Sequence, residues 1–138
     1  MSFKYIENIA LAEAAFEAKG KTLKELFESC ADAFIDTSCN PKTITAIIKK
    51  DFSIEEENVE SLLYDFLSEL IIVKDDGFIF NKVQIKKIDE KSISAEILGE
   101  KINIKKHELK ADIKAITMHK FKVEKVKDGW KAVVVMDI

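Results

Sequence analysis

The sequence contains only one proline and four glycines among its 138 residues. So few residues that break regular structure exclude a loop-dominated or low-complexity chain. Hydrophobic residues make up 47% of the chain and charged residues 34%, which is typical of a compact globular protein and excludes extensive disorder. The length fits one domain with its own hydrophobic core. No linker divides the chain, so we predict a single domain over residues 1–138.

Cysteine is also scarce, with Cys30 and Cys39 as the only two. They are too few and too far apart for a thiolate metal site or a CxxC redox pair, and we interpret both as reduced cysteines of an intracellular protein. The first residues lack the basic start and unbroken apolar segment of a signal peptide. No apolar run approaches the roughly 20 residues needed to cross a bilayer. We therefore expect a cytoplasmic protein without membrane association.

The chain has no large charge excess, since 22 basic and 25 acidic residues give a net charge of −3. A globally positive surface for nucleic acid is thereby excluded, and any connection with RNA requires a local patch or a partner protein. One lysine-rich strip, with acidic residues interleaved, could contact phosphate, but such a strip is more often a solvated face; it comprises Lys101, Lys105, Lys106, Lys110 and Lys114.

Two segments show the apolar periodicity of helices packed against a sheet, TLKELFESCADAFIDT (residues 22–37) and NVESLLYDFLSELIIV (residues 58–73). Thr22 and Glu25 form a capping-box pattern at the start of the first. We expect the apolar faces of both helices to build one core, which includes Leu26, Phe27, Phe34, Leu63, Phe66 and Leu70.

The rest of the chain alternates with the period of β-strands. Strands are predicted within residues 42–54, 77–89, 92–98, 101–106, 111–117, 119–126 and 130–138, with a bulge between Phe80 and Val83 and a final hairpin around Asp128-Gly129. The segment AEAAFEAK (residues 12–19) weakly favours a helix by propensity. The fold class is α+β, with two helices packed on a mainly antiparallel β-sheet.

The last strand carries an acidic residue, Asp137, next to the chain end. Alternation places it on the same face as Val133 and Val135, and both faces of the strand look apolar, so we expect an inner strand that is covered on both sides. A carboxylate in such a place requires a partner or a cation unless the chain end frays into solvent.

No catalytic signature is present: the sequence lacks GxSxG, a glycine-rich phosphate loop, HExxH and a histidine cluster. His107 and His119 lie twelve positions apart, and either could be an ordinary half-buried imidazole. Asp137 and the carboxylate of Ile138 form an acidic strand end that would suit Ca²⁺ or Mg²⁺, which prefer several oxygen ligands. Composition does not identify the remaining ligands.

Three ordered blocks resemble the archease family. HELKADIKAITMHKFKVEKVKDGWKAVVVMDI (residues 107–138) is similar to a family pattern HExKxxVKAVTYH followed by a closing V-V-x-D-I, with Met118 in place of the usual tyrosine. ESLLYDFLSELIIVKDDGFIF (residues 60–80) resembles LLxDWLNELLYLxDxxGFLF. EAKGKTLKELFESCADAF (residues 17–34) resembles AxGKTLEELFxxAAxAxF. The resemblance covers nearly the whole chain and implies an archease-like fold.

The N-terminal region departs from the family, whose acidic-His-Thr-Ala-Asp motif has no clear equal in YIENIALAEAAFEAKGKTL. One alignment places Glu7 and Asn8 on the first two motif positions, and a gapless one places Ile9 and Ala10 there. Both set Glu13 on the final aspartate, and both lose the motif's histidine. The resemblance also changes the expectation for this region to a loop followed by a strand at about residues 14–19.

By resemblance, Glu13, Asp137 and the carboxylate of Ile138 are the ligands of a divalent metal, Ca²⁺ or Mg²⁺/Mn²⁺. The residues of a wider functional surface are Glu7, His107, Lys110, Lys114 and His119. The family activates RNA ligases of the RtcB type, which join 2′,3′-cyclic-phosphate or 3′-phosphate ends to 5′-hydroxyl ends with GTP in tRNA splicing. The resemblance therefore implies an accessory protein that is not itself an enzyme, promotes guanylylation of the ligase, and meets tRNA only indirectly through it.

Two alternatives stay open. The altered N-terminal motif would also fit a chaperone-like or protein-binding module of the same fold that has lost the metal function. A small metal-dependent hydrolase is the other, although no general base is evident beside the acidic residues.

Overall fold

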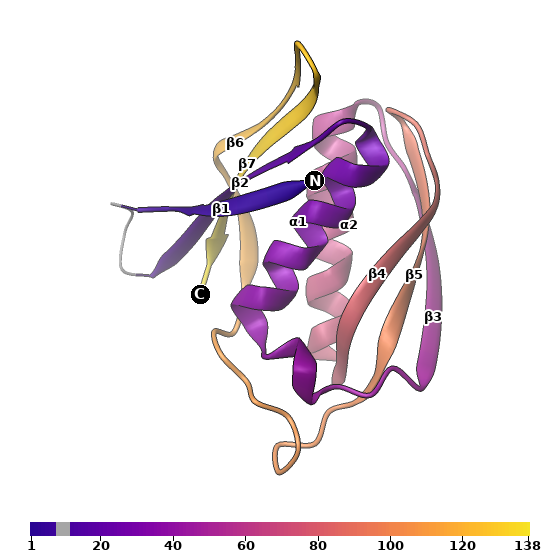
Figure 1. Ribbon diagram of the computed structural model, residues 1–138, viewed down its shortest axis with the longest axis vertical. Helices are drawn as coiled ribbons and strands as arrows, with labels where there is room; N and C mark the ends of the chain where they lie inside the picture. The colour runs from indigo at the N-terminus through magenta and orange to yellow at the C-terminus, as the bar shows by residue number, and fades with distance from the viewer. Residues whose placement is uncertain (8–11) are drawn as a thin grey trace.

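The computed structural model describes residues 1–7 and 12–138. In this part of the chain two helices lie between two antiparallel sheets, one on each side (Figure 1). The first sheet has the strand order β1-β2-β7-β6 and the second the order β3-β5-β4. The elements, in chain order, are β1 (Ser2–Ile6), β2 (Glu13–Gly20), α1 (Leu23–Ser38), the 3₁₀ turn η1 (Pro41–Thr43), β3 (Ile48–Glu55), α2 (Val59–Asp75), β4 (Phe78–Ile88), β5 (Ser92–Lys101), β6 (Ala115–Val126) and β7 (Gly129–Asp137). The α+β class with two helices on antiparallel sheet is confirmed.

Both helices begin where the sequence predicts. The Thr22 hydroxyl accepts a hydrogen bond from Glu25 N at 3.2 Å, and the Asn58 side chain accepts one from Ser61 N at 2.9 Å. These caps satisfy backbone N–H groups that have no partner within the first turn. Helix α2 ends at a turn in which Gly77 has a φ of 85°. Among the described residues, no helix is both long enough and apolar enough to cross a membrane.

The predicted core is confirmed, because its six residues are completely buried: Leu26, Phe27, Phe34, Leu63, Phe66 and Leu70. Phe66 lies at its centre, with ring centroids 5.4 Å from Phe27 and 5.9 Å from Phe52. These contacts join α2 to α1 on one side and to strand β3 on the other. Helix α1 is buried on a wider surface than its apolar stripe indicates, since Ser29 and Ala33 are buried as well.

The strand that the resemblance predicts at about residues 14–19 is confirmed as β2. The helix that local propensity weakly favours there does not form, because β2 pairs along its length with β7 and this pairing overrides propensity. Residues 2–6, expected as part of a loop, form the edge strand β1. Tyr5 attaches this strand to α1, since its hydroxyl donates to Asp36 Oδ2 at 2.6 Å.

The strands expected at residues 101–106 and 111–114 are not observed. Strand β5 ends at Lys101, and β6 begins only at Ala115. The strands predicted at 111–117 and 119–126 are one strand, β6, whose pairing with β7 is irregular between Thr117 and Lys122. Lys120 has a φ of 58°, which is rare for a residue other than glycine and marks the distortion. In β4, the predicted irregularity is confirmed between Phe80 and Lys82.

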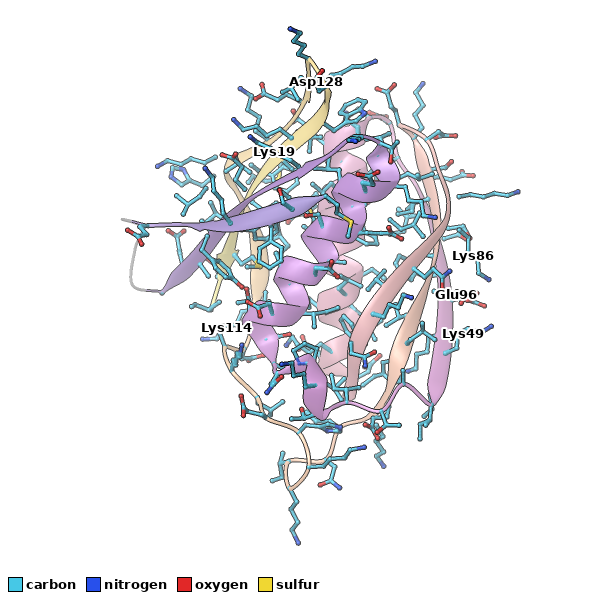
Figure 2. The ribbon with its side chains drawn as sticks, viewed as in Figure 1. Lys19, Lys49, Lys86, Glu96, Lys114 and Asp128 are labelled. Atoms are coloured by element: carbon cyan, nitrogen blue, oxygen red, sulfur yellow. The ribbon has the colours of Figure 1, made fainter. Side chains whose placement is uncertain are left out.

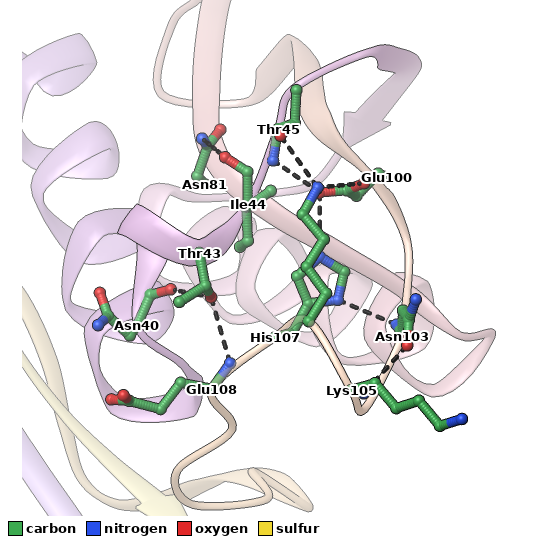
Figure 3. Close-up of polar contacts among 11 residues, drawn as sticks. Asn40, Thr43, Ile44, Thr45, Asn81, Glu100, Asn103, Lys105, His107 and Glu108 are labelled. Atoms are coloured by element: carbon green, nitrogen blue, oxygen red, sulfur yellow. Dashed lines mark hydrogen bonds and ion pairs between the residues drawn. The ribbon is translucent and has the colours of Figure 1, made fainter.

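A buried polar network holds the connection between β5 and β6 (Figure 3). Glu100 is only 9% exposed, and its Oε2 accepts hydrogen bonds from Thr45 N at 2.6 Å and from Lys106 Nζ at 2.8 Å. The same oxygen lies 3.0 Å from His107 Nε2. The loop is therefore fixed by hydrogen bonds to a single carboxylate, where the sequence pattern indicates strands.

Candidate functional site

The first sheet brings together the two acidic residues that the sequence connects by resemblance. Glu13 starts β2 and Asp137 ends β7, and the two are directly opposite each other in the antiparallel register. Residues that face each other in this way point their side chains to the same side of the sheet, with Cβ atoms about 4.5–5.5 Å apart. Both side chains are half-buried. The two carboxylates therefore lie next to each other on one face of the sheet, at the same strand end.

Backbone contacts fix the end of β7 on both sides. Lys114 N donates to Asp137 O at 2.8 Å, just before Ala115 pairs with Asp137. On the other side, Ile138 N donates to Ala12 O at 2.9 Å. Ala115, the neighbour of Asp137 on β6, carries only a methyl side chain.

The sheet separates the acidic pair from the core. Ala132, Val134 and Met136 point from β7 toward the helices and are at most 1% exposed. Asp137 alternates to the opposite face, as predicted. β7 is an inner strand as expected, but the cover on both faces is confirmed only in part: helices cover one face, while on the other Val135 is buried and Asp137 is half-exposed. Asp137 therefore reaches solvent.

The donor atoms of this pair are chemically suited to a divalent metal. Carboxylate oxygens are the ligands that Mg²⁺, Mn²⁺ and Ca²⁺ prefer. Among residues 1–7 and 12–138, no group of three or more His, Cys, Asp or Glu side chains is placed to hold a metal. Two carboxylates alone leave most ligand positions of such a metal to be filled from elsewhere.

Four of the five residues predicted for the wider functional surface are exposed. Glu7 follows β1, and His119 lies in the irregular part of β6, beyond Thr117. Lys114 is next to the acidic pair through its backbone. Lys110 is directed elsewhere, because its Nζ donates to Asp36 O at 3.2 Å and thus fastens residues 109–111 to the end of α1.

His107 is not a surface residue, contrary to its inclusion in the predicted functional surface. Its side chain is fully buried, and its ring bonds on both sides, with Asn103 N donating to Nδ1 at 2.9 Å and Nε2 facing Glu100. Glu100 is the partner that the sequence reasoning missed. Its position at the end of an alternating strand carried no signal for burial. The role of His107 is to hold the loop before β6.

The motif's histidine position cannot be placed in the site. Both alignments put it within residues 8–11, at Asn8 or Ala10, and these residues lie outside the described part of the chain.

The sequence also gave no indication of the attachment between Tyr5 and Asp36. Burial and the hydrogen bond to Asp36 raise the pKa of Tyr5 to about 12, so the hydroxyl keeps its proton and stays a donor.

The structure thus defines the class of protein. It is a small α+β domain with two helices between antiparallel sheets and an acidic pair at one strand end. The model of the Archease protein family (MTH1598/TM1083) matches residues 3–138. The chain therefore belongs to the archease family.

Relatives support this assignment over most of the chain. Protein archease of Pyrococcus furiosus is 41% identical over 132 residues, which cover 92% of this chain and 93% of the relative. Protein archease of Archaeoglobus fulgidus is 36% identical over 141 residues and covers 100% of both chains.

Two solved structures share the fold. Protein 1598 of Methanobacterium thermoautotrophicum has a TM-score of 0.83 at 29% identity, over 99% of this chain and 98% of that one. A Thermotoga maritima protein, described as an archease and possible chaperone, has a TM-score of 0.71 at 23% identity, over 96% of this chain and 97% of that one.

Proposed function

We propose that this archease is an accessory protein that activates an RtcB-type RNA ligase in tRNA splicing, by promoting guanylylation of the ligase and its multiple turnover. Membership of the family supports the proposal, and so does the register that sets Glu13 opposite Asp137. The protein makes no covalent bond to RNA in this role and is not itself an enzyme. tRNA is reached through the ligase.

The acidic pair would act as a half-site for a divalent metal. Glu13, Asp137 and the carboxylate of Ile138 are the residues that would hold it, and the metal would offset the negative charge of phosphate groups. Both side chains are half-exposed at a strand end. A partner protein can therefore approach them and supply the further ligands that the acidic pair leaves open.

The altered residue Glu13 is compatible with this role. Glu carries the same carboxylate as the family's Asp on a side chain one methylene longer. Directly opposite Asp137, the longer side chain reaches the same space with more rotamer freedom, so metal affinity is expected to be lower than with Asp but not lost.

A ligase assay tests the proposal. The ligase of the same organism is incubated with GTP and Mn²⁺ or Mg²⁺, and covalent guanylylation is followed with wild-type protein and with Asp137→Ala. Asp137→Ala should lose the stimulation while keeping its fold. The matched control is Glu90→Ala, which removes an exposed carboxylate from the turn between β4 and β5. If Asp137→Ala stimulates the ligase as wild type does, metal-dependent activation is excluded.

A second candidate function, a chaperone-like or protein-binding module of the same fold, would use exposed apolar side chains. Several large apolar side chains are exposed, among them Ile47 at 72%, Ile104 at 80% and Met118 at 63%. Exposed apolar side chains are typical of protein-binding surfaces when they are contiguous. Stimulation of ligase solubility or stability that persists in Asp137→Ala would favour this function over metal-dependent activation.

A further inference from the structure

A second site lies at the other end of the strands that carry the acidic pair. In the pairing of β2 with β7, Glu13 and Asp137 form one end and Gly20 and Trp130 the other. A pocket of about 440 Å³ opens there, which is within the usual range of ligand pockets. Its lining is rich in lysine and includes Lys19, Lys21, Lys127, Asp128, Trp130 and Lys131. Figure 2 shows Lys19 and Asp128 at this end, away from Lys114.

Two glycines build this pocket from separate segments. Gly129 has a φ of 146°, and a Cβ added there would lie 2.2 Å from Gly20 O. The turn between β6 and β7 therefore packs directly on the backbone that leads into α1. This close approach brings Lys127 of the turn and Lys21 of the helix entry to the same pocket.

Two further lysines at this end of the sheet increase the positive charge near the pocket. Lys19 and Lys131 are directly opposite each other on β2 and β7, and like charges in this position destabilise a sheet. The carboxylate of Glu17 lies 3.9 Å from both ammonium groups, at the limit of an ion pair. One carboxylate thus serves two lysines and leaves part of their charge uncompensated.

The other acidic groups around the pocket are mostly engaged elsewhere. Glu25 accepts from Lys21 N and pairs with the amino group of Met1 at 3.6 Å. Glu124, opposite Lys131 on β6, pairs with Lys122 at 3.1 Å. Asp128 lines the pocket. The ammonium groups of Lys21 and Lys127 have no ion pair within the part of the chain that the structure describes, so the pocket keeps an excess of positive charge.

Trp130 provides the aromatic surface of the pocket. It is half-buried, since part of the ring packs on the core, and it lines the pocket beside the lysines. Lys125 Nζ lies 5.8 Å from the ring centroid, within cation–π range. An aromatic ring for stacking combined with cations for phosphate is the arrangement by which proteins bind single nucleotides and single-stranded nucleic acid.

We propose that this pocket binds a nucleotide unit, with its phosphate on Lys21 and Lys127 and its base against Trp130. The unit is either a free nucleotide or part of a single-stranded RNA. This site goes beyond ligase activation and is independent of it, because it uses neither Glu13 nor Asp137. In contrast to the indirect route through the ligase, it gives the protein a direct contact with nucleotide phosphate.

Trp130 is the only tryptophan of the chain, so its fluorescence reports on this pocket alone. We expect saturable quenching when the full chain is titrated, at low salt, with adenosine 5′-monophosphate and with a five-nucleotide oligoadenylate. The double variant Lys21→Ala/Lys127→Ala should weaken binding by about tenfold or more. The matched control, Lys101→Ala/Lys105→Ala, removes the same charge from exposed positions outside the pocket and should bind as wild type does.

Comparison of the two titrations distinguishes the two sources of the ligand. If the oligonucleotide saturates and the monophosphate does not, the ligand is an RNA strand, and the salt slope should fall by about 0.7 for each phosphate contact removed in the double variant. If the monophosphate saturates equally well, the ligand is a free nucleotide. Absence of saturable quenching by either, or equal affinity of both double variants, would overturn the proposal without affecting the test of ligase activation.

Discussion

Glu100 Oε2 lies 3.0 Å from His107 Nε2, and the contacts around this pair fix the imidazole tautomer. Asn103 N donates to His107 Nδ1 at 2.9 Å, so Nδ1 is an acceptor and the ring proton is on Nε2, which donates to Glu100. The neutral ring therefore acts as a bridge between the loop backbone and a buried carboxylate. This arrangement makes the loop before β6, and so the strand that borders Asp137, dependent on one ionised side chain.

Stability should depend on the charge of Glu100. Hydrogen bonds from Lys106, then His107, then Thr45 N–H lower the pKa of Glu100 from its ordinary 4.5 to about 2. A carboxylate with a lowered folded-state pKa stabilises the protein above its unfolded pKa, and this contribution is lost as the pH falls from about 4.5 toward 2. Glu100→Gln should therefore lower the melting temperature clearly at pH 7 and less at pH 3.

The control for this prediction is Glu90→Gln, an exposed carboxylate in the turn between β4 and β5. It should change the melting temperature little at either pH. An equal loss for Glu100→Gln at pH 7 and at pH 3 would show that the variant acts through packing and that the charge of Glu100 contributes nothing.

Tyr5→Phe should loosen the edge strand β1. The variant removes the hydrogen bond from the hydroxyl to Asp36 at 2.6 Å and the contact with Thr37 at 3.1 Å, at an expected cost of about 1 kcal/mol in the free energy of unfolding. Urea unfolding at pH 8 measures the cost, and amide exchange should accelerate in Ser2–Ile6. Because the folded-state pKa of Tyr5 is raised to about 12, wild type should lose this advantage as the pH rises from about 10 toward 12. Unchanged exchange in β1 would contradict the attachment.

Phe66→Ala should be among the most destabilising single substitutions. The side chain is completely buried between Phe27 and Phe52, and its truncation leaves a cavity that rigid neighbours on two layers cannot fill. The expected loss in the free energy of unfolding is about 3–5 kcal/mol. Ile72→Ala on the same helix is the control, because Ile72 is 54% exposed and should cost far less. Similar melting temperatures for the two variants would show that the assigned helix faces are wrong.

Divalent metal should bind at the Glu13–Asp137 pair. Calorimetric titration with Mn²⁺, Mg²⁺ and Ca²⁺ should give one site for wild type, a large loss of affinity in Asp137→Ala, and equal or higher affinity in Glu13→Asp, which restores the family's side chain. Glu17→Gln is the matched control, because Glu17 lies on the same face of β2, two positions beyond Ala15. Asp137→Ala should melt close to wild type, since the carboxylate has no partner in the core. Metal affinity that falls as much in Glu17→Gln as in Asp137→Ala would refute the assigned site.

The sequence correctly predicted the helices, bulges and turns that depend only on residues close to one another along the chain. The two helices were predicted because an apolar stripe and a capping side chain are read within a dozen residues. The bulge after Phe80 and the turn at Asp128-Gly129 are equally local. Residues 14–19 show the limit of this reasoning: Ala-rich sequence favours a helix, but the pairing of β2 with both β1 and β7 determines the conformation.

The sequence by itself determined the class of fold, the core faces of both helices and the family, and through the family it connected Glu13 with Asp137. Only the tertiary structure decided that these residues lie opposite each other, that His107 is buried against Glu100, and that the lysines of three segments line one pocket beside Trp130. The physical reason is the range of the interactions. Helix periodicity and caps arise from neighbours along the chain, whereas strand register and the burial of a charge depend on the packing of distant segments.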